Sequence, residues 1–295
     1  MSLKDLIADV NVNEICEHIL SLSYGKDSLA CLGAIDQLGW PLDRIVHAEV
    51  WATETIPADL PPMVEFKYKA DQIIKERWGI EVEHFFAQQA GEKKTYENTF
   101  YRKVSNRAME KRRHNPNYTK RGIPRGIPDI YGFPATLKGS WCVGEIKISA
   151  IRKCRTKDSI LYLGIANDET NRFHNLSDTK KSPLVEVGWT EEDCRKWCEK
   201  NDLLSPIYTT ATRGGCWFCH NQSVGQLRLL RKNNPDLWAL MLKWDKDSPV
   251  TFHADGHTVH DFDRRFQLED EGVIYPDDRV FRWSMLEEEL NYRLF

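Results

Sequence analysis

Short apolar runs alternate along the chain with longer amphipathic segments. The short runs are rich in Ile, Val and Leu and have the length of buried strands, whereas apolar residues in the longer segments recur with the period of a helix. This alternation predicts an α/β protein with an open, mostly parallel, twisted sheet flanked by helices. The predicted strands are 15–22, 44–50, 80–86 and 160–165, and the predicted helices are 28–38, 64–78, 190–201, 222–232 and 235–246.

The pattern changes after Cys219, where only helical periodicity remains. Pro235 suits the first turn of a helix, because a proline lacks the N–H that would be unpaired there. We therefore expect an α/β domain over residues 1–225 and a helical C-terminal extension over 226–295. A chain of 295 residues is long enough for such a domain to bury a substantial core.

Composition narrows the class of protein. No apolar run is long enough to span a bilayer, and the first residues lack the apolar core of a signal peptide. We therefore expect a cytoplasmic protein with no membrane partner. The formal net charge of −3 is too small to select partners by itself, so the distribution of charge along the chain matters more.

Residues 23–28, which read SYGKDS, lie between the first predicted strand and the first predicted helix. A helix start leaves backbone N–H groups unpaired, and these attract an anion. Gly25 lets the backbone approach a phosphate, Lys26 adds a positive charge, and Asp27 would hold Mg²⁺ or cap the helix. The alternative is a surface turn before a well-capped helix. The candidate phosphate contacts are Ser23, Tyr24, Gly25, Lys26, Asp27 and Ser28.

This loop resembles that of the PP-loop, or N-type, ATP pyrophosphatases, whose SxGxDS sequence binds the β,γ-pyrophosphate of ATP. The resemblance implies that an acceptor attacks the α-phosphorus and that Lys26 and Asp27 are catalytic, with ATP and Mg²⁺ as ligands. Members of the family bind nucleotide at the carboxyl ends of strands, so Glu49, at the end of the second predicted strand, and Gly164, at the end of the fourth, are further candidates. For Glu49 the alternative is a half-exposed acid without a ligand.

Four of the eight cysteines form a candidate metal site. Cys216 and Cys219 make a CxxC motif, and two thiolates at this spacing can bind one ion. Cys142 and Cys154 would complete four-sulfur ligation, which is typical of zinc or of a [4Fe–4S] cluster. His220 competes with Cys154 for the fourth position, and a metal-free CxxC is the alternative to the whole site.

The other four cysteines are predicted to lie in the core. Cys16 and Cys31 fall in the first strand and the first helix, where small buried thiols are common. Cys194 and Cys198 are four residues apart on a helix that Thr190 begins as part of a capping box, so they share one helix face.

A series of motifs over residues 10–245 resembles the phosphoadenosine phosphosulfate reductase family in its broad sense. In chain order these are SYGKDS, SWC with EIK, YLGI, DE, PIY, GCWFC and NPDLW. The nearest chemistry is that of the DNA phosphorothioation ATP pyrophosphatase, which carries an iron–sulfur cluster. The resemblance implies cleavage of ATP to AMP and pyrophosphate to adenylate an acceptor for sulfur transfer or nucleic-acid modification, with a sulfur-donor protein as a further partner.

Two departures from the family leave alternatives open. No cysteine follows Cys219, whereas reductases of the family use a nucleophilic cysteine in a C-terminal tail. Ala166 stands where family members usually have an arginine that recognises a ribose phosphate or sulfate. A sulfonucleotide reductase with an unusual electron path, and a catalytically silent nucleotide-binding subunit, are the two other hypotheses.

Residues 91–139 are strongly basic. They contain twelve Lys or Arg and four Asp or Glu, a net charge of +8, so the rest of the chain carries −11. Aromatic residues that could stack on nucleic-acid bases are interspersed with these charges, namely Tyr96, Phe100, Tyr101, Tyr118 and Tyr131. A basic insertion that binds nucleic acid or nucleotide is one interpretation. The other is a solvated helical face over 95–113 followed by a connector.

Overall fold

The structure is a computed structural model, and it divides into two compact units. The α/β unit takes its residues from Met1–Glu49, Pro61–Phe86 and Ile148–Gly214, and the second unit from Val50–Leu60, Ala87–Lys147 and Gly215–Phe295. Each unit is assembled from three stretches of sequence. The predicted boundary after residue 225 stays a prediction. The residues described are 16–105, 130–134, 140–174, 176–209 and 214–286.

A parallel sheet organises the α/β unit. Its strands are β1 (His18–Leu22), β2 (Arg44–Glu49), β3 (Val82–Phe86), β6 (Ile160–Leu163) and β7 (Lys180–Lys181). They pair in the order β3-β2-β1-β6-β7, and every pairing is parallel. The predicted α/β class with an open parallel sheet is therefore confirmed. The first four strands coincide with the four predicted ones to within a few residues.

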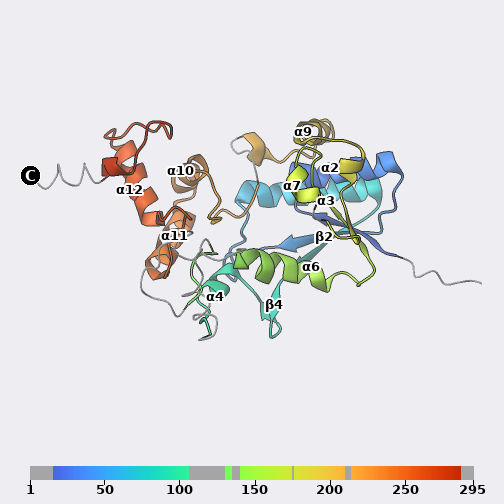
Figure 1. Ribbon diagram of the computed structural model, residues 1–295, viewed down its shortest axis with the longest axis horizontal. Coiled ribbons are helices and arrows are strands. Elements are labelled where there is room, and N and C mark those ends of the chain that lie inside the picture. Colours follow the sequence, from blue (N-terminus) through green and yellow to red (C-terminus); the bar gives the residue numbers. More distant parts are fainter. Residues whose placement is uncertain (1–15, 106–129, 135–139, 175, 210–213, 287–295) are drawn as a thin grey trace, which may run out of the picture. The chain divides into compact units, whose positions relative to one another are not determined.

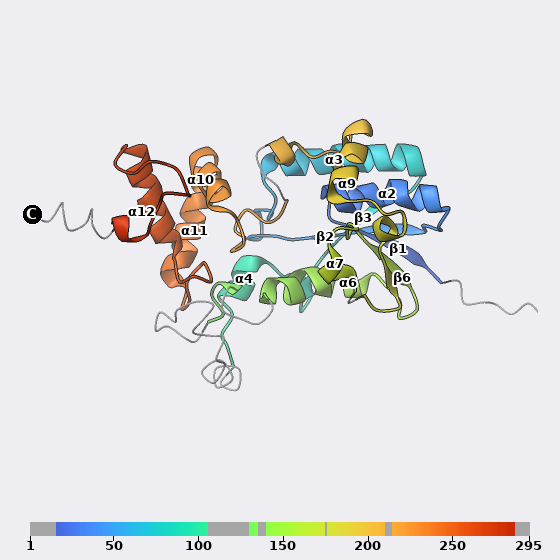
Figure 2. The ribbon, with the colours of Figure 1, turned by 45° about the horizontal axis from the view of Figure 1, so that its top comes forward.

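Helices cover both faces of this sheet (Figures 1 and 2). On β1, Leu20 and Leu22 pack with residues of α2 (Lys26–Leu38) and α3 (Pro61–Trp78). Ile19 packs on the opposite face with Cys154, which follows α6 (Ser149–Lys153). Alternation of side chains along a strand places neighbours on opposite faces, so burial of both sets explains the continuous apolar run at the start of the chain. The helices are α2 (Lys26–Leu38), α3 (Pro61–Trp78), α6 (Ser149–Lys153) and α9 (Glu191–Lys200).

Helix α9 packs closely on α2. The Thr190 hydroxyl accepts a hydrogen bond from the Asp193 N–H, and the Asp193 side chain accepts one from the Thr190 N–H, so the predicted capping box is present. Cys194 and Cys198 are fully buried in the core that α9 shares with α2, as predicted. The Trp197 indole of α9 occupies the space next to Gly33 of α2 where a Cβ would lie.

The second unit has a core rich in aromatic residues. Its helices include α4 (Tyr96–Phe100), α10 (Val224–Asn233), α11 (Pro235–Asp247) and α12 (Val259–Asp270), and the last three confirm the predicted helical C-terminal region (Figure 1). Helix α4 ends at Phe100. Within the described residues, the helix expected over 95–113 is therefore only 5 residues long. Residues 106–113 lie outside the described residues.

The remaining elements are short. No helix in the described part of the chain is both long and apolar enough to cross a membrane. These elements are β4 (Gln88–Gln89), β5 (Glu92–Lys93), η2 (Val143–Ile148), α7 (Thr170–Phe173), α8 (Pro183–Glu186) and η3 (Pro206–Thr209).

The contact between α2 and α9 gives a test of the packing. A Cβ added at Gly33 would lie 2.2 Å from the Trp197 Nε1 atom, so Gly33→Ala must push the two helices apart. We expect a loss of about 1–3 kcal/mol in the free energy of unfolding, measured by urea denaturation. Gly225→Ala, on α10, is the matched control because no atom lies within 4 Å of its added Cβ. Equal stability of the two variants would contradict this packing.

Candidate functional site

The turn between β1 and α2 is closed by hydrogen bonds of its own serines. The Ser28 hydroxyl donates to the Gly25 carbonyl at 3.0 Å, and it accepts from the Ser23 N–H at 3.1 Å and from the Ser23 hydroxyl at 3.0 Å. The two hydroxyls expected to contact phosphate are therefore engaged with each other. Their contribution is to fix the shape of the turn.

Tyr24 has an unusual backbone conformation in this turn. Its φ of 56° is in the left-handed region, which costs a non-glycine residue about 1–2 kcal/mol, and its side chain is fully buried. Gly25 follows with extended backbone and no side-chain cap, so α2 begins at Lys26 without a capping side chain. The N–H groups of the first turn of α2 thus form the anion-attracting end that the sequence predicted.

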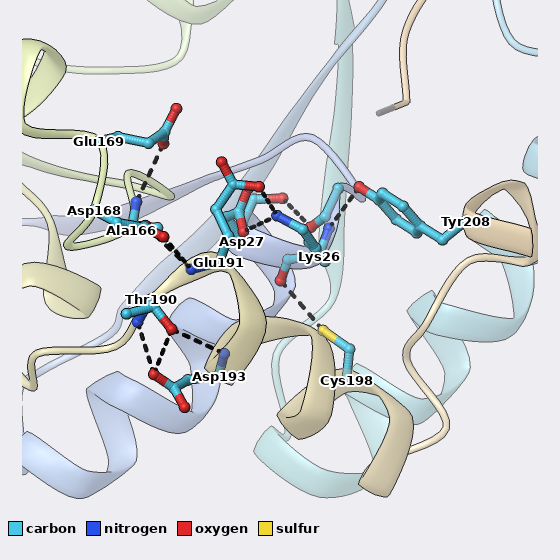
Figure 3. Close-up of polar contacts among 12 residues, drawn as sticks. Lys26, Asp27, Ala166, Asp168, Glu169, Thr190, Glu191, Asp193, Cys198 and Tyr208 are labelled. Atoms are coloured by element: carbon cyan, nitrogen blue, oxygen red, sulfur yellow. Dashed lines mark hydrogen bonds and ion pairs between the residues drawn. The ribbon is translucent and has the colours of Figure 1, made fainter. Parts of the chain in front are cut away.

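Lys26 is buried between two carboxylates (Figure 3). Its Nζ lies 2.7 Å from Asp27 Oδ1 and 2.7 Å from Glu191 Oε2, the latter from the first residue of α9. Burial lowers the pKa of Lys26, but hydrogen bonds to the two acids outweigh it and leave this pKa raised. The ammonium group is therefore a fixed positive charge at the start of α2.

Tyr208 of η3 contacts the same helix end. The Lys26 backbone N–H donates to the Tyr208 hydroxyl oxygen at 3.0 Å (Figure 3). A phenol oxygen thus takes one of the positions at the helix N-terminus where an anion oxygen is favoured. The carbonyl of Lys26 accepts from the Cys198 thiol at 3.2 Å, so both backbone groups of Lys26 have partners.

Gly164 holds the end of β6 against the first turn of α2. A Cβ added at Gly164 would lie 2.5 Å from the Ser28 backbone nitrogen and 2.8 Å from the Asp27 carbonyl carbon. Only a glycine allows this approach of two backbones. The structure thus gives Gly164 a packing role directly beside the predicted nucleotide contacts.

Further acids surround Asp27. Burial raises the pKa of Asp27, Lys26 opposes this shift, and the charges of Glu191 and Glu169 add to it. Asp168 accepts from the Glu191 N–H at 3.2 Å, and Glu169 accepts from the N–H of the buried Ala166 at 3.2 Å. Asp168 and Glu169 therefore hold the loop after β6 and the start of α9 next to Lys26.

Glu49 belongs to a second group of polar side chains, which contacts Tyr24 of the turn. His84 Nδ1 lies 3.0 Å from Glu49 Oε1, and His84 Nε2 lies 3.0 Å from Asp71 Oδ2. The Tyr24 hydroxyl donates to Asp71. Hydrogen bonds to Asp71 and then to Glu49 raise the pKa of His84 to about 9. The structure thus connects Glu49 to Tyr24 through His84 and Asp71, while Lys26 is held by Asp27 and Glu191.

A second histidine supports the Tyr24 ring. His47 Nε2 lies 2.8 Å from the Lys67 ammonium nitrogen, and its Nδ1 lies 2.8 Å from the Leu22 carbonyl. Because an ammonium group only donates, Nε2 must accept and Nδ1 must carry the proton that is donated to Leu22. The imidazole is then neutral, and its ring meets the Tyr24 ring edge-on with centroids 4.8 Å apart.

Three of the predicted metal ligands lie in one neighbourhood of the second unit. Burial, followed by the charges of Cys216 and Cys219, raises the pKa of Cys142 to about 12. The charges of these three cysteines, that of Cys216 most strongly, raise the pKa of Lys147. The Lys147 cation is therefore stabilised when these thiols lose their protons. Nevertheless, no three His, Cys, Asp or Glu side chains of the described residues are arranged to hold a metal ion.

Cys154 is in the other unit. It is buried next to Ile19 and Leu161, and its thiol donates to the Ala150 carbonyl at 3.1 Å. The structure therefore does not bring Cys154 together with the other predicted ligands within one unit. His220, the competitor for the fourth position, lies in the second unit with its Nε2 3.2 Å from the Ser140 hydroxyl.

Most of the basic segment, including eight of its twelve Lys and Arg, lies outside the described residues. Of its described members, Lys94 and Arg102 both form ion pairs with Glu145. Lys93 places its Nζ 3.4 Å from the centroid of the Trp51 ring. These three cations contribute to the second unit itself, so the nucleic-acid interpretation now depends on the exposed Lys103, on residues 106–129 and on Lys138.

Sequence reasoning missed several residues of the site. Glu191 was visible only as the residue after a capping threonine, and Tyr208 only as part of the PIY motif. His84 and Asp71 carried no signal, because a histidine in a strand and an aspartate in an amphipathic helix are ordinary. No protein-family model, curated protein or solved structure was found to match this chain.

The raised pKa of His84 gives a pH test. Since His84 titrates near 9 in the folded protein and at about 6.5 when unfolded, its stabilising effect is complete below pH 6.5 and is lost as the pH rises through 9. Wild type should therefore lose melting temperature between pH 6.5 and 9 more steeply than His84→Gln. Above pH 9 the difference between the two curves should be constant. Parallel curves between pH 6.5 and 9 would contradict the two carboxylate contacts.

Proposed function

We propose that this chain is an ATP pyrophosphatase-type enzyme of the phosphoadenosine phosphosulfate reductase family in its broad sense. It cleaves ATP to AMP and pyrophosphate and adenylates an acceptor for sulfur transfer or nucleic-acid modification. The observation that carries the proposal is the buried, fixed charge of Lys26 at the uncapped start of α2, at the carboxyl edge of a parallel sheet. This edge is where open α/β sheets bind their ligands.

The residues of the turn supply electrostatic stabilisation. The acceptor attacks the α-phosphorus while pyrophosphate leaves toward the N–H groups of α2 and the Lys26 ammonium. Donors that are already fixed in place stabilise negative charge on the leaving oxygens without the cost of reorienting solvent. Tyr24 keeps the turn in position, because its hydroxyl donates a hydrogen bond to Asp71 of α3.

The carboxylates beside Lys26 fit a magnesium ion. Mg²⁺ in nucleotide sites takes one or two carboxylates together with phosphate oxygens, and Asp27 and Glu191 provide two carboxylates. Mg²⁺ supplies charge neutralisation of the bridging and leaving oxygens when it is bound. Asp27 and Glu191 would hold the ion, and the Lys26 ammonium would bind a phosphate oxygen.

A thiolate-bound zinc ion or iron–sulfur cluster on Cys142, Cys216 and Cys219 is part of the proposal. The donor set is chemically suitable, and the nearby Lys147 offsets its negative charge. Cys154 is replaced as fourth ligand by a residue of the second unit, and His220 is our candidate. The acceptor is proposed to be anionic, on the basis of the net charge of +8 over residues 91–139.

The central test is pyrophosphate release from ATP in the presence of Mg²⁺. Lys26→Ala should lower the rate about 10²- to 10³-fold, the usual cost of removing one fixed donor to the developing charge. Lys200→Ala, an exposed lysine at the end of α9, is the matched control and should retain wild-type activity.

The same assay separates the other hypotheses. Sulfite formed from phosphoadenosine phosphosulfate, with no pyrophosphate from ATP, would support a reductase and contradict the proposal. Binding of ATP without turnover, in the presence of short nucleic acids and a persulfide donor, would support a silent nucleotide-binding subunit. Because the assay depends on Lys26 and not on the cysteines, it tests the nucleotide site independently of the metal centre.

A further inference from the structure

The hydroxyl of Tyr96 is buried without a hydrogen-bond partner among the described residues. Tyr96 is the first residue of α4 and is 1% exposed, so water does not solvate its hydroxyl group. Buried tyrosines usually find a partner for this group, because an unpaired donor in an apolar core costs free energy. A buried donor without a partner therefore needs an explanation.

The ring of Tyr96 lies among residues that are adjacent to the cysteines. Its centroid is 4.2 Å from that of Phe218, which precedes Cys219, and 5.0 Å from that of Trp141, which precedes Cys142. The electrostatic interaction of the hydroxyl is strongest with Cys142, weaker with Cys219 and weakest with Cys216. Tyr96 therefore belongs to the aromatic cluster against which Cys142 and Cys216 pack.

We propose that Tyr96 is a positioning residue for a metal centre on these thiols, and that its hydroxyl donates a hydrogen bond to a metal-bound thiolate sulfur. A protonated thiol is a weak acceptor, whereas a thiolate carries negative charge and accepts strongly. The hydroxyl therefore gains its partner when the cysteines lose their protons on binding metal. This inference depends on the proposed metal centre, and it adds a residue of α4 that orients it.

The core around Tyr96 favours one orientation of this hydroxyl. Besides Phe218 and Trp141, the Trp244 ring lies with its centroid 5.2 Å from that of Tyr96. Aromatic rings on several sides prevent the phenol from turning toward solvent. A hydroxyl that stays unpaired and one that bonds to sulfur predict different results for removal of the oxygen atom.

The test is metal affinity of the full chain with and without this oxygen. Tyr96→Phe keeps the ring and its packing, and it should weaken Co²⁺ binding about tenfold, as is usual when a partner of a metal ligand is removed. Affinity is measured by anaerobic titration with Co²⁺, followed by thiolate-to-cobalt absorbance, and by competition of bound Zn²⁺ with a chelator. If the purified protein carries an iron–sulfur chromophore, Tyr96→Phe should lose it to the chelator about tenfold faster.

Tyr101→Phe is the matched control. Tyr101 is in the same unit, and its hydroxyl donates to Asp247 at 2.6 Å, so its loss should lower stability without changing metal affinity. Cys142→Ser should lower metal affinity more than Tyr96→Phe does. Thermal melting of the metal-free variants separates folding from binding, because Tyr96→Phe removes an unpaired buried donor and should melt no lower than wild type.

Each outcome has a definite meaning. Equal metal affinity of wild type and Tyr96→Phe overturns the role of Tyr96 and leaves the metal centre in place. A wild-type protein that binds neither metal nor cluster overturns both. Neither result affects pyrophosphate release, which depends on Lys26 in the other unit.

Discussion

The position of the turn at the start of α2 depends on the hydrogen bond from the Tyr24 hydroxyl to Asp71. Tyr24 has a left-handed backbone, which disfavours any residue with a side chain, yet its ring is fully buried. Burial of a ring of this size and a bond to a carboxylate outweigh the backbone cost. His84 holds the same carboxylate from its other side at 3.0 Å, so the turn, α3 and β3 are joined by a single polar group.

A second constraint is the charge of Lys26. Lys26 is only 8% exposed, and a buried ammonium group is unstable without anions, which Asp27 and Glu191 provide. A phosphate group is also an anion, and its oxygens accept charge-assisted hydrogen bonds from an ammonium group as carboxylate oxygens do. Asp27 and Glu191 thus lie where phosphate oxygens would lie in the proposed function, and exchange between carboxylate and phosphate is its physical basis.

The second unit is organised by its aromatic core. Tyr96 and Trp244 pack with Trp217 and Phe218, the two residues inside the CxxC motif, so the motif is fixed from within the core. A CxxC whose central residues are buried presents its two cysteines in a defined direction. Packing of Trp141 on Tyr96 places Cys142 beside them. The thiols therefore share a neighbourhood because of the rings next to them.

The sequence by itself determined four strands of the parallel sheet, five of the helices, the glycine turn between β1 and α2, the capped start of α9 and the buried pair Cys194 and Cys198. These depend on periodicity, on a glycine and on contacts a few residues apart, which are local properties. Only the tertiary structure decided that Glu191 and Tyr208 meet Lys26, because these partners are separated from it by 165 and 182 residues. It also placed Cys154 in the sheet core and packed Tyr96 against the aromatic residues next to Cys142 and Cys219, since long-range packing determines which side chains meet and carries no period in the sequence.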